Sequence, residues 1–309
     1  MTPVKIAILG YGKIAEDQHV PAIAANPRFA LAASSSRSGQ GVAQAFTDWR
    51  DLIRSVDGLQ AVAITTPPAP RYEIARECIL AGLHCLLEKP PTAGLAEIAD
   101  LECLAQAQGV TLFTTWHAQH HATVETAARA LAGKRIRSMT IRWHEDVQKW
   151  HPGQAWIWEP GGFGVFDPGI NAFSIATRIF PGGLFVRDAT LSIPRNAQTP
   201  IAADVTFSSP VADGPLTASL DWRRTSDEEW TIAIETIDGV RLRLEDGGAS
   251  LSLDDANSAD DGPGEYPDIY RRFADLIDQR QSLVDVAPLR LVADCLLCGS
   301  RREVEPIEM

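Results

Sequence analysis

A glycine-rich turn directly after a short apolar strand is the feature that most constrains the fold of this chain. Val4–Leu9 is mostly apolar, and the next six residues follow the pattern G-x-G-x-x-A: Gly10-Tyr11-Gly12-Lys13-Ile14-Ala15. In that pattern the first glycine permits a tight turn, the second lets the backbone approach a pyrophosphate, and the small third residue lets helix and strand pack closely. The pyrophosphate would lie on the N–H groups at the helix start. The turn therefore predicts a dinucleotide site that includes Gly10, Gly12, Lys13 and Ile14.

Short apolar strands alternate with helical segments through the first 120 residues. Further strands are expected at Phe29–Ser34, Ala61–Thr65, His84–Leu87 and Val110–Thr114. Helices are expected near His19–Ala25 and at Tyr72–Ala81 and Leu95–Gln108. Strands of continuous apolar character separated by helical crossovers form parallel sheets that are covered on both faces. We therefore expect residues 1–120 to form a Rossmann domain with a doubly wound parallel sheet, which gives a chain of α/β class.

The pattern changes after about residue 120 to successive strands, several of which alternate polar and apolar residues. These strands are expected at Ile136–Trp143, Asp188–Pro194, Ala202–Ser208, Thr217–Trp222, Trp230–Asp238 and Val240–Leu244. Helices are expected at Ile170–Ile179, Tyr266–Arg280 and Leu289–Arg302, with a solvated acidic loop at Asp254–Glu265. We expect residues 121–309 to form an α+β domain for substrate binding, with a large, mostly antiparallel open sheet. The exposed face of such a sheet is a common surface for homo-oligomers.

Composition excludes several classes of partner. The formal net charge is −12, whereas binding to nucleic acid or to an anionic membrane needs clustered lysine and arginine. No apolar run approaches the roughly 20 residues that span a bilayer, and a strand begins at Val4 without the layout of a signal peptide before it. Five cysteines at irregular spacing are typical of reduced thiols. These features predict a cytoplasmic protein whose partner is a small molecule.

The residues after the second strand indicate which cofactor is bound. An NAD-selective site places an acidic residue there to accept a hydrogen bond from the ribose 2′-hydroxyl. This chain has Ser34-Ser35-Ser36-Arg37-Ser38 instead. Hydroxyls and a guanidinium can bind a 2′-phosphate, and no carboxylate is present to repel it. NADP is therefore the expected cofactor, with Ser36 and Arg37 as contacts, and use of NAD is left open.

Two later motifs point to hydride transfer. Thr65-Thr66-Pro67-Pro68 ends the third strand of the first domain, and Thr66 and Pro67 are expected beside the nicotinamide ribose. Glu88-Lys89-Pro90 ends the next strand. A lysine in this position, downstream of a dinucleotide turn, would place a cation beside the nicotinamide. Glu88 and Lys89 are therefore added to the predicted cofactor contacts.

With these motifs the chain resembles the glucose–fructose oxidoreductase/inositol dehydrogenase/rhizopine catabolism (Gfo/Idh/MocA) family. The resemblance also covers Gly161–Asn171, where the family has G-G-G-x-x-x-D-x-G-x-H, but Asn171 replaces the histidine. It implies that Lys89 is catalytic and that the Lys89–Pro90 peptide is cis. Because an amide cannot exchange protons near neutral pH, Asp167 is the expected base, Lys89 its charged partner and Asn171 a hydrogen-bonding residue for substrate. The reverse assignment, with Lys89 as base, stays open, as does a role for Asp167 as helix N-cap.

Within the family, the chain resembles the bacterial L-arabinose/D-galactose 1-dehydrogenases. The stretches that carry this likeness are Thr115-Trp116-His117, Glu145-Asp146-Val147 and Trp150-His151-Pro152-Gly153-Gln154. The resemblance implies oxidation of the anomeric carbon of an aldose, bound between the domains, to a lactone. The expected substrate contacts are His117, Glu145, His151, Asp167, Asn171, Trp150 and Trp222, although some tryptophans could instead belong to the core.

Two alternatives stay open. Other oxidoreductases of the family act on inositols, dihydrodiols or keto-sugars, and a non-catalytic NADP-binding sugar sensor is also compatible with the fold. His117, His120 and His121 could suggest zinc, but His120 and His121 point to different sides of a helical turn, and no acidic ligand is evident. We expect no metal, since the cofactor accepts the electrons.

Overall fold

The structure is a computed structural model that describes residues 2–308. The chain divides into two compact units, which are described separately. Unit 1 consists of Met1–His117 and Pro263–Val286, and unit 2 of Ala118–Gly262 and Ala287–Met309. Within residues 2–308, no helix is both long enough and apolar enough to cross a membrane.

Unit 1 is built on a six-stranded sheet in the order β3-β2-β1-β4-β5-β6, with every neighbouring pair parallel. Its strands are β1 (Val4–Leu9), β2 (Phe29–Ser35), β3 (Gln44–Phe46), β4 (Ala61–Ile64), β5 (His84–Leu87) and β6 (Leu112–Thr114). The strand order reverses between β1 and β4, and ligands of such sheets bind at the carboxyl ends of the strands beside this reversal. The predicted doubly wound Rossmann sheet is confirmed.

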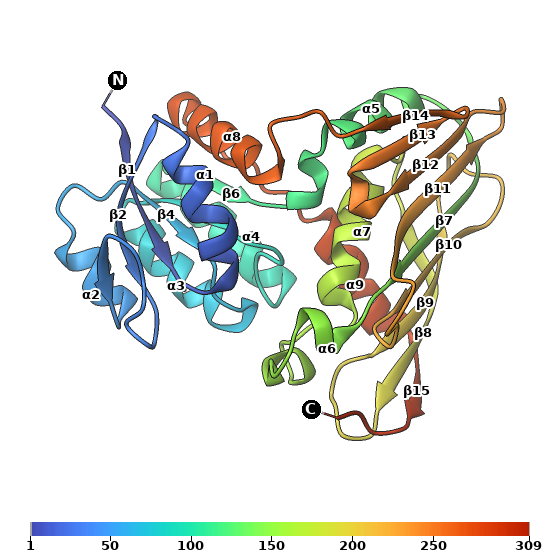
Figure 1. Cartoon of the computed structure of the whole chain (residues 1–309), viewed down its shortest axis with the longest axis horizontal. Helices are drawn as coiled ribbons and strands as arrows, with labels where there is room; N and C mark the ends of the chain where they lie inside the picture. Colours follow the sequence, from blue (N-terminus) through green and yellow to red (C-terminus); the bar gives the residue numbers. More distant parts are fainter. Residues whose placement is uncertain (1, 309) are drawn as a thin grey trace. The chain divides into compact units, whose positions relative to one another are not determined.

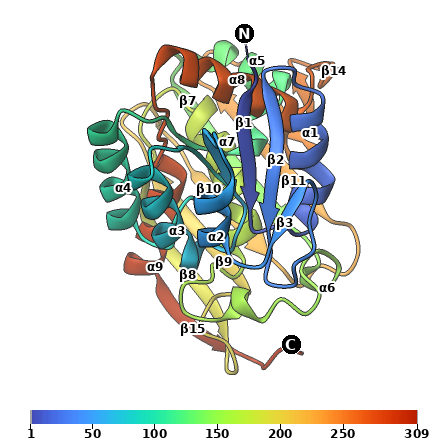
Figure 2. The ribbon, with the colours of Figure 1, turned by 90° about the vertical axis from the view of Figure 1, so that its left-hand side faces the viewer.

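Helices cover both faces of this sheet, with α1 on one side and α3 and α4 on the other (Figure 2). The helical segments of the unit are η1 (Ala15–His19), α1 (Val20–Ala24), α2 (Trp49–Ser55), α3 (Pro68–Leu80), α4 (Leu95–Gln108) and α8 (Glu265–Gln279). Each crossover connects two parallel strands, so the strands become buried on both faces. Accordingly, every residue of β4 is buried.

Helix α8 corrects the sequence prediction, which assigned Tyr266–Arg280 to the second domain. The chain instead returns to unit 1 after residue 262. Tyr270 and Phe273 of α8 are fully buried in one cluster with Ile6 and Ile8 of β1. Their rings pack on Phe29 at centroid distances of 5.6 and 5.8 Å. The five-residue helix α1 is too short to cover that face alone, so the buried side of an amphipathic helix from much later in the chain completes the core.

Unit 2 carries a nine-stranded sheet in the order β14-β13-β12-β11-β7-β10-β9-β8-β15. Only the pairs β7–β10 and β8–β15 are parallel among its described strands. The strands are β7 (Ile136–His144), β8 (Phe185–Pro194), β9 (Ala202–Ser208), β10 (Leu216–Asp221), β11 (Glu229–Thr236), β12 (Arg241–Glu245), β13 (Ser250–Leu253), β14 (Ala256–Ala259) and β15 (Ser300–Val304). The predicted large, mostly antiparallel sheet is confirmed.

Helices of unit 2 pack on one face of this sheet, as α7 and α9 do in Figure 1. The helical segments are α5 (Ala122–Leu131), α6 (Val147–Trp150), η3 (Ala155–Trp158), α7 (Phe166–Ile179), η4 (Asp246–Gly248) and α9 (Ala287–Cys298), while η2 (His117–His120) spans the division between the units. The opposite face carries charged side chains, such as Arg142 and Arg243, which lie 3.6 and 3.7 Å from Glu229.

Four strands were not predicted, namely β3, β13, β14 and β15. The expected acidic loop contains β14, because Asp254 and Asp255 both adopt positive φ and form a two-residue hairpin turn with β13. The expected helix Leu289–Arg302 ends at Cys298, and β15 begins at Ser300. A side chain at Gly299 would come within 2.4 Å of the Cys295 carbonyl, so the chain can turn closely against the helix only with glycine there.

Candidate active site

The glycine turn lies against the end of β4. Gly10 has φ +101°, and a Cβ there would come within 2.7 Å of the Thr66 backbone N, so only glycine fits. Gly10 and Tyr11 donate N–H bonds to the Ser35 carbonyl at 3.0 and 2.7 Å. The turn is therefore fixed to its two neighbouring strands, β2 and β4, at the reversal of strand order.

The following residues present backbone to solvent at the start of η1. Gly12, Lys13 and Ile14 are exposed, whereas Ala15 is fully buried, as the close helix–strand packing requires. The Lys13 side chain pairs with Asp17 one turn later. Lys13 would therefore contact a pyrophosphate through its backbone.

The end of β4 offers an unsatisfied polar group to a ligand. Thr65 donates its hydroxyl to the Gly10 carbonyl at 2.7 Å, and the neighbouring Thr66 Oγ1 is buried without a hydrogen-bond partner. Buried hydroxyls without a partner are rare in proteins. Thr66 Oγ1 and the narrow approach at Gly10 fit a dinucleotide at this position.

At the end of β2, Ser36 Oγ donates to the Gln40 carbonyl at 2.6 Å and lies 3.2 Å from Ser38 Oγ. Arg37 is exposed. The structure therefore places the predicted phosphate contacts in one short turn beside the Rossmann strand end.

The Glu88-Lys89-Pro90 segment follows β5, and the Lys89–Pro90 peptide is cis, as the resemblance implied. Glu88 is only 4% exposed, and its carboxylate accepts hydrogen bonds from His19 at 3.0 Å, from Tyr266 at 2.9 Å and from the Lys89 backbone at 2.9 Å. Its side chain is thus engaged inside unit 1, which favours a supporting role over the cofactor contact predicted for it.

Glu88 is an ionised carboxylate. Burial alone would raise its pKa, but the hydrogen bond from His19 and the charges of His19, His117 and Arg71 outweigh that effect and lower the pKa from 4.5 to about 2. A group with so low a pKa cannot act as the base of a reaction near neutral pH. Proton transfer in unit 1 therefore falls to other residues.

Arg71 was missed in the sequence. It is 2% exposed, and its guanidinium donates to the carbonyls of Thr66, Glu88 and Pro90. The available signal was its position on α3: Arg71 shares the buried side of that helix with Ile74 and Cys78, at i+3 and i+7. An arginine on an apolar stripe needs buried acceptors, and here these are backbone carbonyls of the two motifs.

His117 also belongs to unit 1. Its Nδ1 lies 3.0 Å from Glu265, and its ring stacks on Tyr266 with centroids 6.0 Å apart. Helix α8 thus holds both Glu88 and His117 through neighbouring residues.

In unit 2, Asp167 and Asn171 lie in the first turns of α7, in a stretch packed too tightly for side chains at its glycines. A Cβ at Gly162 or Gly164 would come within 2.3 Å of a backbone carbonyl. Asp167 is buried, and Asn171 Oδ1 is buried without a hydrogen-bond partner. The glycine-rich motif therefore sets the start of α7, and an amide oxygen there can accept a hydrogen bond from a ligand.

His151 joins this group from the residue after α6. Its Nε2 lies 3.4 Å from Asp167 Oδ2, and its ring packs on the Trp222 ring with centroids 5.2 Å apart. Trp222 is 0% exposed and donates its N–H to Glu145 at 2.9 Å, and Trp230 donates to the other Glu145 oxygen at 2.8 Å. Glu145 and Trp222 were predicted as substrate contacts, but the structure gives them a supporting position behind His151.

Trp150 lies at the exposed edge of this cluster, beside Trp230. Its side chain is 47% exposed, its N–H donates to Glu228 at 2.6 Å and its ring meets Trp230 edge to face. It therefore has indole surface available for a ligand. Across residues 2–308, the acidic, histidine and cysteine side chains form no group of three that could hold a metal ion.

The chain is similar to known sugar oxidoreductases along its whole length. Residues 4–116 match a model described as an oxidoreductase family with an NAD-binding Rossmann fold. A galactose 1-dehydrogenase of Pseudomonas fluorescens is 42% identical over 319 residues, which cover 99% of each protein.

Solved structures agree with this relationship. A D-galactose-1-dehydrogenase protein from Rhizobium etli is 45% identical, with a TM-score of 0.94 over 100% of this chain and 99% of that one. A 3-ketoreductase from Actinomadura kijaniata, solved with NADP and TDP-benzene, has a TM-score of 0.80 over 98% and 99% of the chains at 17% identity, which shows the fold alone. Unit 1 contains an NAD(P)-binding Rossmann domain, and the chain belongs to the Gfo/Idh/MocA family of oxidoreductase enzymes.

Proposed function

We propose that this protein is an NAD(P)-dependent aldose 1-dehydrogenase that oxidises the anomeric carbon of D-galactose- or L-arabinose-type sugars to the aldonolactone. The observation that carries the proposal is the polar group at the start of α7. There, buried Asp167 lies beside His151, and Asn171 Oδ1 lacks a partner. The 42% identity to a galactose 1-dehydrogenase across the chain supports the substrate class.

The residues of the chain have distinct roles in this reaction. Asp167 takes the proton of the C1 hydroxyl, directly or through Lys89, as the C1–O bond gains double-bond character. His151 orients the Asp167 carboxylate, and the Asn171 amide oxygen accepts a hydrogen bond from a sugar hydroxyl. When bound, the nicotinamide supplies the acceptor for the hydride that leaves C1. Lys89 belongs to unit 1 and Asp167 to unit 2, so their joint action on one hydroxyl is itself part of the proposal, as is the reverse assignment of the base to Lys89.

Gly10, Gly12, Lys13, Ile14, Thr66 and Pro67 would hold the dinucleotide. Ser36 and Arg37 would contact a 2′-phosphate, and this favours NADP, since no carboxylate is present at residues 34–38 to accept from a 2′-hydroxyl. Arg37→Asp tests this choice, because a carboxylate there repels phosphate. The variant is expected to lose roughly tenfold or more in affinity for NADP while affinity for NAD stays within about twofold. An unchanged NADP affinity would exclude Arg37 from the site.

Sugar recognition is assigned to His117, His151, Asn171 and Trp150. An amide or imidazole that pairs with a substrate hydroxyl discriminates strongly against analogues that lack or invert it. D-galactose and L-arabinose share their configuration at ring carbons 2 to 4, so a single set of contacts can accept both.

The decisive experiment is an absorbance assay of cofactor reduction. It crosses L-arabinose, D-galactose, D-glucose, D-xylose and myo-inositol with NAD and NADP. Reduction with D-galactose and L-arabinose, and at least tenfold weaker kcat/KM for D-glucose, is expected. Turnover of myo-inositol alone would move the protein to another branch of the family. Cofactor binding with no turnover of any sugar would favour the sensor.

The outer face of the nine-stranded sheet is proposed as the contact between two copies of the chain. Arginine and glutamate alternate there, as at Arg142, Glu229 and Arg243, so two such faces can be complementary in charge. Light scattering tests this directly: a monomeric mass at micromolar concentration would exclude it. Location in the cytoplasm stays a prediction.

A further inference from the structure

Arg71 buries a permanent charge whose partners include three backbone carbonyls. The side chain is 2% exposed on α3, and its two terminal nitrogens donate to Thr66, Glu88 and Pro90. Burial of a guanidinium is unfavourable unless it is paired and hydrogen-bonded. The hydrogen bonds to the three carbonyls therefore offset the cost of burying this charge, and they hold those carbonyls in place.

The three carbonyls belong to the two motifs beside the cofactor site. Thr66 ends the β4 segment that lies against the glycine turn, while Glu88 and Pro90 are the residues on either side of Lys89. One guanidinium thus joins the end of β4 to the end of β5. Because arginine presents its donors in a rigid planar fork, it can fix several acceptors at once, whereas the three donors of lysine radiate from a single nitrogen.

The same segment is held from a second direction through the Glu88 side chain. One oxygen accepts from His19 and Tyr266, and the other accepts from the backbone N–H of Lys89. His19 is itself fixed by the Tyr270 hydroxyl, 2.7 Å from its Nδ1. The peptide groups around Lys89 are therefore tied to α3, to η1 and to α8.

We propose that Arg71 is a positioning residue for the reaction. It acts through the backbone on both sides of Lys89 and so determines where the Lys89 ammonium can reach. A lysine side chain has four rotatable bonds, so its reach is defined only if its backbone is fixed. A misplacement of about 1 Å can reduce turnover about 100-fold. The proposal rests on the catalytic role proposed above for Lys89.

Arg71→Lys removes the planar guanidinium but keeps the positive charge. The variant is expected to bind NADP within about twofold of wild type, with KM for the sugar little changed and kcat reduced roughly 10- to 100-fold. Arg76→Lys is the matched control, because Arg76 lies on the same helix and is exposed. A kcat equal to wild type per folded molecule in Arg71→Lys would overturn the proposal, because a purely structural arginine would change only the folded fraction.

A second measurement does not depend on the sugar reaction. Lysine amines are labelled with trace acetic anhydride across a pH series, and each site is quantified by mass spectrometry. The labelling of Lys89 relative to Lys5, a half-buried lysine of the same unit, is expected to change at least threefold in Arg71→Lys. The same direction of change is expected in Tyr266→Phe, which removes one donor to Glu88 but keeps the ring, and this variant serves if Arg71→Lys does not fold.

The two proposals fail in different ways. Wild-type protein that reduces no cofactor with any sugar would refute the proposed function, while a changed labelling ratio would still support the positioning of Lys89 by Arg71. If the wild-type protein turns over a sugar but the Lys89 labelling ratio is unchanged in both variants, the positioning role is refuted and the proposed function stands.

Discussion

Replacing Glu88 with glutamine removes a buried negative charge that several donors stabilise. The carboxyl has a pKa of about 2 in the folded protein against 4.5 when unperturbed. This difference corresponds to about 3 kcal/mol of free energy of unfolding. Because the pKa is lowered on folding, the contribution is fully present above pH 4.5 and is lost as the pH falls from 4.5 toward 2. The glutamine side chain also has an NH₂ group, which would face one of the donors that now bind the Glu88 carboxylate. Glu88→Gln is therefore expected to lower the free energy of unfolding by about 3 kcal/mol at pH 7.

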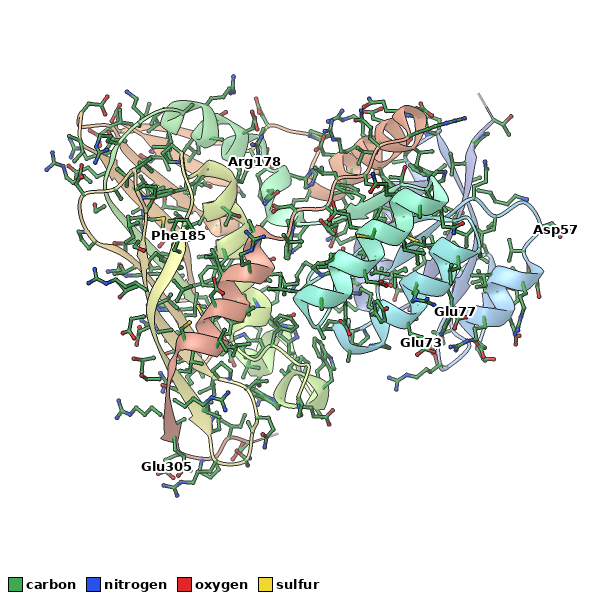
Figure 3. All side chains as sticks on the ribbon, turned by 180° about the vertical axis from the view of Figure 1, so that it is seen from behind. Asp57, Glu73, Glu77, Arg178, Phe185 and Glu305 are labelled. Carbon is green, nitrogen blue, oxygen red and sulfur yellow. The ribbon has the colours of Figure 1, made fainter. Side chains whose placement is uncertain are left out.

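Urea unfolding followed by circular dichroism at pH 7, 5.5, 4.5 and 4 measures this effect. The gap in free energy of unfolding between wild type and Glu88→Gln should narrow below pH 4.5, because the carboxyl of the unfolded wild-type protein then takes up a proton, whereas glutamine cannot. Glu73→Gln is the matched control: Glu73 is labelled in Figure 3 on α3, is 66% exposed in its side chain and pairs with Arg50. A surface pair of this kind contributes at most about 1 kcal/mol. A loss below about 1 kcal/mol for Glu88→Gln at pH 7, or a gap that does not narrow in acid, would refute the account of Glu88.

Three further outcomes are expected. Lys89→Ala should reduce kcat by a factor of about 1,000 or more while NADP still binds, as measured by cofactor titration and steady-state kinetics; retained turnover would contradict its catalytic role. Gly10→Ala should abolish measurable NADP binding and lower stability by about 1–3 kcal/mol, because its Cβ would meet Thr66 and φ is positive; normal binding would contradict the geometry of the turn. Trp222→Phe should cost about 1–3 kcal/mol in urea unfolding, because it leaves one Glu145 oxygen without its buried donor; an unchanged midpoint would show that Glu145 finds another partner.

The local pattern of apolar and polar residues was sufficient to predict most of the fold. Continuous apolar runs predicted the central strands of unit 1, and Leu95–Gln108 was predicted with the bounds that the structure gives α4. The failures have physical causes. The apolar stripe of α8 does not indicate which sheet the helix covers, so the helix was assigned to the second domain by its order in the chain. The β13–β14 turn uses aspartates at positive φ, where sequence patterns lead one to expect glycine or asparagine.

The candidate site was predicted less completely than the fold. Motifs identified Gly10, Lys89, Asp167 and Asn171 because their residue types and spacing carry the chemistry. Arg71 could not be found in this way, since its partners are backbone carbonyls, which leave no trace in the side-chain sequence. Sequence reasoning detects groups that act on a ligand more readily than groups that act on the backbone.

In each unit, a buried carboxylate helps to hold the candidate reactive group in place. In unit 1, Glu88 bonds the backbone N–H of Lys89. In unit 2, Glu145 accepts from Trp222, whose ring packs on His151 beside Asp167. Both glutamates stand in sequence motifs, so loss of activity on mutation could be taken as evidence of catalysis. Their burial predicts a different signature, because removing either charge leaves buried donors unsatisfied. Activity and unfolding free energy should fall together for the glutamates, whereas Lys89→Ala should reduce activity with little change in stability.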